Sequence, residues 1–539
     1  MSFDYIVVGA GAAGCITAVR LAEDRACRVC LIEAGGNDAS PWVRIPMFSF
    51  VAWSRPQWSW GYSTEPNAAM DGRQLALTQA KILGGGTSIN GMLYARGHPA
   101  EFDRWQVPGW SFAELLPFFK RSESYSGGET KWRGGSGPIM TRPSTLNLPI
   151  VNAFLTAAER AGFARASDLN SDVLNSFGPI DVAIGRGIRQ SAALRFGVKH
   201  RSNLTVLRDT RTLRILVDKG KAVGVAIADR HGQRLIRAEC EVIISAGAIN
   251  SPKLLLGSGI GPADELRALG IEAICDVPAV GRNLSNHANY TLMYEVSQPV
   301  TAYRFRSPLR AIAGGLAYAF QRDGFLAETT FSAGGVIATS PGEMVPDVNI
   351  ALSSALMGPG PGIWKTMPQA HGFMLSVRQG TPYSRGQVRL RSADPMAPPV
   401  IDTRYFSDPR DIEVLANGVR TARRIAAQPD MQRYVSKELR PGPLAEDGLA
   451  LIQHLKENAG NVFHPGGTCR LGADSDSVVD PKLRVRGVDG LRVADASVLP
   501  MLTTAGTFAS SMMVGERAAS FIRGECSEKS MRAPCRPGP

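Results

Sequence analysis

The N-terminal residues combine three closely spaced glycines with one acidic side chain, a combination suited to binding a dinucleotide. Gly9, Gly11 and Gly14 form the pattern G-x-G-x-x-G, and Glu33 follows 24 positions after the first glycine. In this pattern the first glycine permits a tight turn, the second lets the backbone approach a pyrophosphate, and the third lets a helix pack on a strand. Glu33 can accept hydrogen bonds from both ribose hydroxyls, which favours an adenosine without a 2′-phosphate.

The residues around these glycines predict the elements that must position them. The apolar run 3–8 predicts a buried strand, residues 12–23 suit a helix, and residues 28–32 predict a second strand that ends at the acid. The N-terminus of the helix would present free N–H groups and a partial positive charge to the phosphates. The sequence therefore predicts a dinucleotide site at the N-terminus, and this motif fits NAD and FAD equally.

A second glycine-rich stretch covers residues 81–97. Three adjacent glycines, followed by Thr87, Ser88 and Asn90, make a poor helix start by intrinsic propensity. They supply a dense set of backbone and side-chain donors instead. We expect this stretch to contact phosphates or the edge of a ring.

Later segments are predicted to return to the first sheet. Residues 204–207, 223–228 and 235–236 predict successive strands, and 241–246 predict another buried strand followed by a helix at 253–256. This strand–turn–helix matches the arrangement that begins at residue 3. The cofactor domain is therefore expected to be assembled from distant segments.

The pattern changes between residues 288 and 460. The alternating residues 387–391 suit an antiparallel strand with one wet face, and residues 411–427 suit a helix. Together they indicate a separate layer that covers the substrate. Residues 524–539 have little apolar content and are predicted to be a disordered tail.

Composition excludes several classes of protein. The 539 residues are 44% hydrophobic and 20% charged, which is ordinary for a globular chain and excludes disorder as its main character. Lys and Arg number 60 against 48 Asp and Glu, a net charge of +12, but the bases are scattered, so we expect no nucleic-acid partner. The charge could still attract anionic substrates or membrane surfaces.

Other features bear on metals and location. Cys27 and Cys30 form a lone C-x-x-C without a second pair, so no metal site is predicted. No segment reaches the 18 or so uninterrupted apolar residues that indicate a membrane span. The beginning of the chain, Met1-Ser-Phe-Asp4, does not resemble a secretory leader, and a cytoplasmic location is expected.

Six stretches resemble the glucose–methanol–choline (GMC) oxidoreductases, which are FAD-dependent enzymes that act on alcohols. They run in family order from residue 5 to about residue 520, nearly the whole chain. The stretches are Gly9–Gly14 with Glu33, Ile82–Gly97, Ser245–Pro262, Val280–Leu284, Phe463–Gly472 and Leu491–Pro500.

The resemblance implies an α/β fold, with a doubly wound Rossmann-type FAD-binding domain and a second, α+β substrate domain built on an antiparallel sheet. It assigns residues 1–150, 195–287 and 461–523 to the FAD-binding domain, and 151–194 and 288–460 to the substrate-binding domain. The residues it implies for cofactor binding are Gly9, Gly11, Ala12, Gly14, Glu33, Ala34, Gly85, Thr87, Asn90, Gly91, Leu93, Leu213, Ala246, Asp495, Ala496, Gly506 and Thr507. Some members attach FAD covalently through a His at the position of Ile89, so FAD is expected here without a covalent bond.

The same resemblance points to His464 as the catalytic base, with Phe463, Pro465 and Gly506 in the substrate pocket. A neutral imidazole would take the hydroxyl proton of an alcohol as hydride passes to flavin N5. The family normally carries a second His or Asn where this chain has Gly506. A minority of the family lacks that residue, including an enzyme that oxidises the heteroaromatic alcohol of vitamin B6. An aromatic or heteroaromatic primary alcohol, pyridoxine-like, is therefore the expected substrate class.

Three functions remain open. The leading one is oxidation of such an alcohol to the aldehyde, with O₂ as the favoured acceptor. The alternatives are a choline or alcohol dehydrogenase that uses another acceptor, and a redox-neutral lyase that keeps FAD. A flavin-binding protein whose activity has decayed is disfavoured by the intact motifs. The sequence leaves the acceptor, the exact alcohol and the oligomeric state open.

Overall fold

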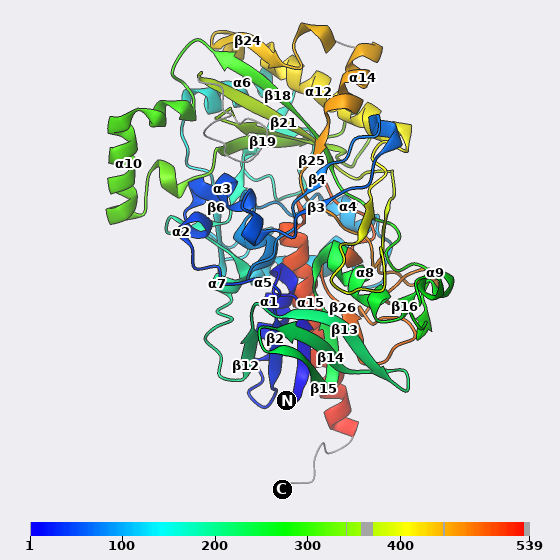
Figure 1. Ribbon diagram of the computed structural model, residues 1–539. Coiled ribbons are helices and arrows are strands. Elements are labelled where there is room, and N and C mark those ends of the chain that lie inside the picture. Colours follow the sequence, from blue (N-terminus) through cyan, green and yellow to red (C-terminus); the bar gives the residue numbers. More distant parts are fainter. Residues whose placement is uncertain (1, 341, 357–369, 446–447, 533–539) are drawn as a thin grey trace.

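The computed structural model describes residues 2–340, 342–356, 370–445 and 448–532. Two large β-sheets lie at opposite ends of the molecule, and helices cover both (Figure 1). One sheet has a parallel core and the other is almost wholly antiparallel. This arrangement confirms the predicted fold class.

The first sheet joins segments that are far apart in the sequence. Its strand order is β12-β2-β1-β15-β14-β13, and β26 pairs with the end of β15. The strands are β1 (Ser2–Val8), β2 (Val29–Ile32), β12 (Leu204–Leu207), β13 (Arg211–Asp218), β14 (Lys221–Asp229), β15 (Gly232–Ile244) and β26 (Leu491–Val493). Strands β1, β2, β12 and β26 run parallel to their partners, whereas β13, β14 and β15 form an antiparallel meander.

The burial of this sheet explains why short apolar runs form its strands. Almost all of β1 and all of β2 are buried, as the short apolar runs predict for strands covered on both faces. Helix α1 (Ala12–Leu21) packs beside α15 (Thr507–Arg532), so the first and last helices of the chain lie side by side in the centre of Figure 1. The C-terminal helix therefore completes the layer that the N-terminal motif begins.

The second sheet has the order β24-β18-β21-β20-β19-β8-β7, with β25 on β18. Its strands are β7 (Ala164–Arg165), β8 (Ser176–Pro179), β18 (Ala288–Val296), β19 (Phe331–Ile337), β20 (Val348–Ser353), β21 (Gly372–Gln379), β24 (Val435–Arg440) and β25 (Gly460–Asn461). Helices α6 (Pro149–Arg160) and α12 (Pro409–Ala426) pack on one face. In β18 every second residue is buried against these helices, so the alternate residues face inward to the middle of the molecule.

The other elements of the described residues lie outside the two large sheets. The remaining strands are β3 (Tyr62–Ser63), β4 (Ala76–Leu77), β5 (Glu123–Tyr125), β6 (Ile139–Pro143), β9 (Asp181–Val182), β10 (Ile184–Gly185), β11 (Ile188–Arg189), β16 (Ile260–Gly261), β17 (Cys275–Asp276), β22 (Gln387–Arg389) and β23 (Val400–Asp402). The remaining α-helices are α2 (Pro41–Arg44), α3 (Ser49–Trp53), α4 (Pro99–Asp103), α5 (Phe112–Ser122), α7 (Ala192–Arg195), α8 (Gly247–Gly257), α9 (Ala263–Ala268), α10 (Pro308–Gln321), α13 (Pro429–Gln432) and α14 (Gly448–Asn458). Single 3₁₀ turns are η1 (Pro46–Phe48), η2 (Pro56–Trp58), η3 (Ala68–Met70), η4 (Gly85–Ser88), η5 (Ala302–Arg306), η6 (Phe325–Ala327), η7 (Pro443–Ala445) and η8 (Ala496–Val498).

The structure corrects some predicted boundaries. Residues 235–236 and 241–246 were expected to form two strands, but β15 is one strand of 13 residues that pairs first with β14 and then with β1. The partly exposed strand β13 lacks a clear apolar pattern and was not predicted. Helix α8 begins at Gly247, although Pro252 suggested a later start. The carbonyl of Ala248, which Pro252 cannot bond, accepts the Thr468 hydroxyl at 2.6 Å instead.

The C-terminus also differs from its prediction. Helix α15 continues to Arg532, through most of the stretch from residue 524 that was expected to be disordered. Residues 533–539 lie outside the described residues. Within the described chain, no helix is both long and apolar enough to cross a membrane.

Candidate active site

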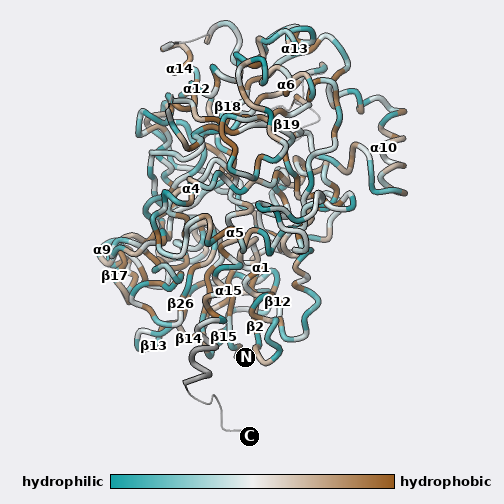
Figure 2. The backbone as a smooth tube through the Cα atoms, turned by 180° about the vertical axis from the view of Figure 1, so that it is seen from behind, coloured by the Kyte–Doolittle hydropathy of each residue, from teal (hydrophilic) through white to brown (hydrophobic). Residues whose placement is uncertain are grey.

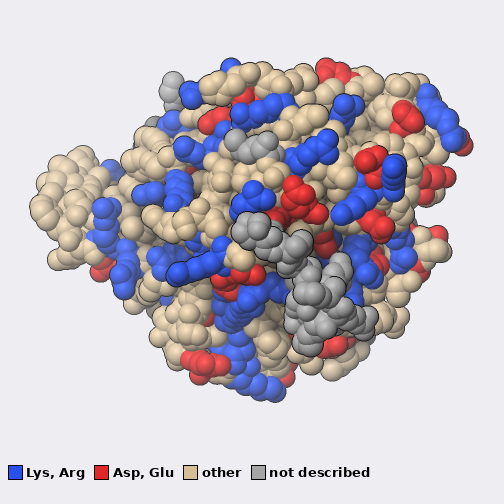
Figure 3. All heavy atoms as spheres, turned by 90° about the horizontal axis from the view of Figure 1, so that it is seen from below, with Lys and Arg blue, Asp and Glu red and all other residues tan. Residues whose placement is uncertain are grey.

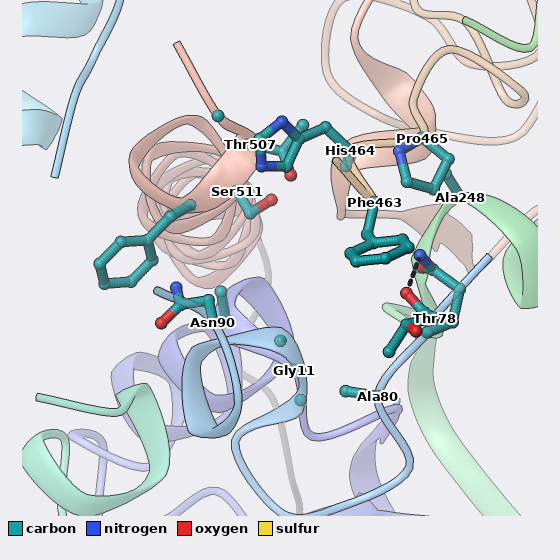
Figure 4. A pocket seen from close by; sticks show the side chains of 18 of the residues that line it. Gly11, Thr78, Ala80, Asn90, Ala248, Phe463, His464, Pro465, Thr507 and Ser511 are labelled. Carbon is teal, nitrogen blue, oxygen red and sulfur yellow. Dashed lines mark hydrogen bonds between the residues drawn. The ribbon is translucent and has the colours of Figure 1, made fainter. Parts of the chain in front are cut away.

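A cavity of about 670 Å³ lies between the two sheets, within the range of ligand sites in proteins. Its wall contains every candidate residue from the sequence except Gly14. Figure 4 shows His464 and Phe463 across the cavity from Gly11 and Asn90, with Thr507 and Ser511 on the N-terminal turns of α15. The glycine-rich segments and the histidine motif thus meet around one space.

The glycines of the first motif bring backbone to the cavity. A Cβ on Gly9 would lie 2.3 Å from the carbonyl oxygen of Ser245, and a Cβ on Gly85 would lie 2.7 Å from Cα of Gly11. A Cβ on Gly11 would come within 4.0 Å of one atom only, the carbonyl oxygen of Ser245. No side chain caps helix α1, which follows Gly11. Gly11, Ala12 and Ala13 line the cavity, so the uncapped start of α1 lies at its wall, as a phosphate site requires.

Gly14 has a different position from the other glycines. A Cβ there would lie 1.9 Å from the carbonyl oxygen of Gly9, and Gly14 does not line the cavity. Gly14 lies where α1 packs closely against the preceding turn, and a side chain there would clash with that turn. This agrees with the packing function that the motif predicts for the third glycine rather than with direct phosphate binding.

Glu33 lies at the end of β2 and is buried. Its carboxylate accepts the backbone N–H of Ala10 at 3.0 Å and that of Gly35 at 2.7 Å. Burial raises the pKa of Glu33 to about 7, although both N–H bonds oppose that rise. Each carboxylate oxygen has a second lone pair, so Glu33 can still accept hydroxyl donors from the cavity.

Asn90 is oriented by a buried arginine below its loop. Nη1 of Arg189 donates to Oδ1 of Asn90 at 2.6 Å, and the N–H of Met92 donates to the same oxygen at 3.1 Å. With Oδ1 engaged in this way, the Nδ2 group of Asn90 remains as a donor toward the cavity. Burial lowers the pKa of Arg189 to about 9. The loop therefore presents a fixed amide donor beside the free N–H groups of α1.

His464 forms a pair with a second histidine. Its Nδ1 lies 3.1 Å from Nδ1 of His287, which precedes β18, and the two rings are nearly perpendicular. The backbone N–H of His464 donates to Oδ1 of Asn286 at 2.9 Å. Phe463 adopts a left-handed φ of 63°, uncommon for an aromatic residue, and both it and His464 line the cavity.

The histidine pair is held neutral. Burial, together with the positive charge of Arg378, lowers the pKa of His464 to about 3. The pKa of His287 is also well below its usual value, because of burial, then the charge of Arg378, and then repulsion from His464 when that ring is protonated. Only one proton can lie between the two Nδ1 atoms. If His464 donates it, Nε2 of His464 has a free lone pair and can act as a base.

Gly506 leaves room at that nitrogen. A Cβ on Gly506 would lie 3.0 Å from both Nε2 and Cε1 of His464, closer than side chains usually approach. The next residues begin α15, whose positive N-terminal end lies at the cavity wall. Absence of a side chain at 506 therefore opens space beside the Nε2–Cε1 edge of His464.

Arg378 brings a positive charge to the same wall. It lies on the inward face of β21, opposite Asn289 of β18 and Asn349 of β20, and all three residues line the cavity. Nη2 donates to the carbonyl of Thr504 at 2.6 Å, whereas Nε is buried without a hydrogen-bond partner. In the described part of the chain no carboxylate forms a salt bridge with it. Burial lowers the pKa of Arg378 to about 10, so it remains charged at neutral pH.

Sequence reasoning missed His287, Arg189 and Arg378. His287 follows the stretch Val280–Leu284 by three residues, so its place beside a family motif was a usable signal. The two arginines had no such signal, because only the sheet register and loop packing bring them to the cavity. Among the described residues, no group of three or more His, Cys, Asp or Glu could hold a metal ion.

Comparisons with known proteins agree with this geometry. Two sequence profiles described as GMC oxidoreductase match residues 3–289 and 382–515. An oxygen-dependent choline dehydrogenase of Sinorhizobium medicae (strain WSM419) is 38% identical over 536 residues, covering 97% of this chain and 96% of that protein. A similar dehydrogenase of Sinorhizobium fredii is also 38% identical, over 537 residues with the same coverage.

Solved structures share the whole fold. Pyridoxine 4-oxidase from Mesorbium loti matches with a TM-score of 0.86 and 28% identity, covering 97% of this chain and 99% of that one. A formate oxidase of Aspergillus oryzae RIB40 matches with a TM-score of 0.91 and 26% identity, covering 98% and 99%.

Proposed function

Because the chain belongs to the GMC oxidoreductase family, whose enzymes use FAD and act on CH–OH groups, we propose that it oxidises an aromatic or heteroaromatic primary alcohol to the aldehyde. The observation that carries this proposal is the geometry of His464. Its Nδ1 meets His287, and its Nε2 faces the space that Gly506 leaves in the cavity. O₂ is the favoured electron acceptor.

The residues around the cavity fit FAD. In the proposed assignment the free N–H groups after Gly11 bind the pyrophosphate, Glu33 accepts the adenosine ribose hydroxyls, and Asn90 donates to the flavin side. Ile89 has only alkyl atoms and packs with Val43, Ala52 and Ile82, so covalent attachment is not indicated. When bound, FAD supplies the two-electron acceptor for the alcohol.

His464 is proposed as the base that removes the hydroxyl proton. Nε2 can accept it only if Nδ1–H donates to His287, so the pair must hold one tautomer. Nε2 of His287 is buried without a hydrogen-bond partner, and the backbone of Thr503 and Gly380 partly opposes the lowering of the pKa of His287. When the proton of His287 is on Nε2, its Nδ1 has a free lone pair. That lone pair can accept the Nδ1–H of His464. His287 is thus proposed as a positioning residue.

Aromatic side chains bind both a ring and a quaternary ammonium group, so the preference for a ring rests on the charge at the wall of the cavity. Phe50, Trp53, Phe331 and Phe463 line it, and Gly506 removes bulk beside His464. The charge of Arg378 would repel choline, whereas it would attract a ring that carries an acidic or anionic substituent, such as a phenolate. Pyridoxine belongs to that class of alcohol.

Choline oxidation is the second candidate, because the curated relatives are choline dehydrogenases. Four acidic side chains line the cavity and could in principle hold a cation: Glu33, Asp181, Asp394 and Asp495. Each already accepts hydrogen bonds from this chain. The names of the choline relatives and of pyridoxine 4-oxidase support O₂ as the acceptor.

The test is anaerobic reduction of the bound flavin, followed near 450 nm, with pyridoxine, benzyl alcohol and choline. Faster bleaching by the ring alcohols supports the proposal, and faster bleaching by choline supports the second candidate. Conversion of an alcohol without bleaching would indicate a redox-neutral lyase. Peroxide release, measured beside reduction of a dye, separates O₂ from another acceptor.

We also propose the domain division given by the sequence. The strands of the first sheet fall within 1–150, 195–287 and 461–523, and this supports an FAD-binding domain made of those segments. The strands of the second sheet fall almost wholly within 151–194 and 288–460, which supports the substrate-binding assignment. A cytoplasmic location is part of the proposal, and the six cysteines described as free thiols suit a reducing compartment.

A further inference from the structure

Helix α10 projects from the side of the molecule and stands clear of the chain in both views (Figures 1 and 2). Four large apolar side chains are exposed along it: Leu309 is 82% exposed, Ile312 61%, Leu316 54% and Phe320 83%. Their spacing of three and four residues places them on one face of the helix. Only Tyr318 of the helix is buried, and its hydroxyl donates to the carbonyl of Gly187 at 3.0 Å. We call these four residues the α10 face.

The surroundings of the α10 face are basic. Residues 301–323 contain four arginines, Arg304, Arg306, Arg310 and Arg322, and a single acid, Asp323, at the end of the segment. The guanidinium of Arg322 lies 5.0 Å from the ring of Tyr318, beside the end of the helix. Figure 3 shows an uncharged bulge at the side of the molecule where α10 lies, bordered by Lys and Arg side chains. An apolar stripe with basic flanks is typical of a helix that lies in a membrane interface.

Two tryptophans lie on the same side of the molecule. Trp42 on α2 and Trp53 on α3 are each 37% exposed, and both helices are on the side of α10 in Figure 1. Helix α10 packs on η6, and η6 packs on η1, between α2 and α3. Arg55 lies 4.8 Å from the ring of Trp42. Tryptophan and arginine are both favoured at the level of lipid headgroups.

We propose that the α10 face docks this protein on the surface of a bilayer that contains anionic lipid. The apolar side chains enter the boundary between headgroups and acyl chains, and the arginines contact lipid phosphates. A second copy of the chain fits this surface poorly. Symmetric pairing would bring the four arginines of each copy together, with Asp323 as the single carboxylate of residues 301–323 to compensate them.

Docking would set the cavity close to the membrane. Phe50 and Trp53 of α3 line the cavity, and α3 lies on the side that carries the α10 face. An apolar substrate dissolved in the bilayer would therefore meet the protein near this wall. The docking proposal goes beyond the proposed function and does not depend on which alcohol is oxidised.

The test is co-sedimentation of the FAD-loaded full chain with vesicles of phosphatidylcholine alone or with one quarter phosphatidylglycerol. The variant carries Leu316→Glu and Phe320→Glu, and both side chains are exposed, so the fold should persist. Leu449→Glu is the matched control, because Leu449 is 87% exposed but lies on α14, away from α10. Analytical ultracentrifugation without vesicles gives the oligomeric state of all three proteins.

We expect the wild type to bind the phosphatidylglycerol vesicles about tenfold more strongly than the neutral ones, with binding that falls as salt is raised. The double variant should lose about tenfold of that binding, and Leu449→Glu should behave as wild type. Equal sedimentation of wild type and double variant overturns the proposal. So does a wild-type dimer that ignores vesicles and becomes monomeric in the double variant, which would assign the α10 face to a second copy.

Discussion

Replacing His287 by Ala tests whether this residue positions the catalytic base. The change removes the acceptor that lies 3.1 Å from Nδ1 of His464 and leaves that nitrogen buried without a partner. An unsatisfied buried polar group costs about 1–3 kcal/mol. At about 1.36 kcal/mol for each factor of ten, flavin reduction should slow about 5- to 160-fold if that cost falls on the transition state.

The measurement is the limiting rate of anaerobic flavin reduction in stopped flow, at equal FAD content. His287→Asn is the matched control, because its Oδ1 can take the place of Nδ1 and accept from His464. We expect the Asn variant to recover most of the rate that the Ala variant loses, with a similar KM in both. A wild-type rate in His287→Ala, or an Asn variant as slow as the Ala variant, would refute the positioning role.

Four further predictions concern the same cavity. His464→Ala should slow flavin reduction about 10²–10⁴-fold, the usual contribution of general acid–base catalysis, with little change in the flavin spectrum; a near wild-type rate would assign the base to another residue. Because burial lowers the pKa of His464 to about 3, the base is neutral above that pH, and wild-type reduction should be nearly independent of pH between about pH 5 and pH 9. A rate that rises through about pH 6.5 would show that the histidine titrates normally. Glu33→Ala should weaken FAD retention at least about tenfold, because charge-assisted hydrogen bonds contribute about 1.5–3 kcal/mol each; retention is measured by flavin content after dialysis, with Glu33→Gln as a milder control. Acid should release free FAD from the wild type, whereas flavin that stays with the precipitate would show a covalent bond.

The pH prediction shows how structure changes an expectation from sequence. From residue type alone, His464 should titrate near neutral pH, and activity should rise as it loses its proton. The fold buries the ring and places Arg378 near it, and both effects disfavour the charged form. Activity should still rise as His464 loses its proton, since the neutral form is the base. Because the pKa is lowered, that rise should occur well below neutral pH.

The elements that we propose bind phosphate were determined by the sequence itself. A turn at Gly9, an uncapped helix start at Gly11 and an acid at the end of β2 depend on backbone freedom and on apolar runs, which are local properties. The same applies to the inward face of β18, whose alternation follows from the two-residue period of a strand. The resemblance to a family also identified His464 as a candidate residue, because the motif around it, Phe463–Gly472, is a short local stretch.

Only the tertiary structure decided which distant residues meet His464. His287 lies 177 positions earlier in the chain, and Arg378 reaches the cavity because the register of β21 places it opposite Asn289. A shift of one residue in that register would turn Arg378 to the other face of the sheet. Register depends on packing against α6 and α12 and on hydrogen bonding along the antiparallel strands β24, β18, β21, β20, β19 and β8. No short stretch of sequence encodes these long-range contacts. Local sequence therefore set the elements of the proposed cofactor site, whereas long-range packing set the electrostatic surroundings and the protonation of His464.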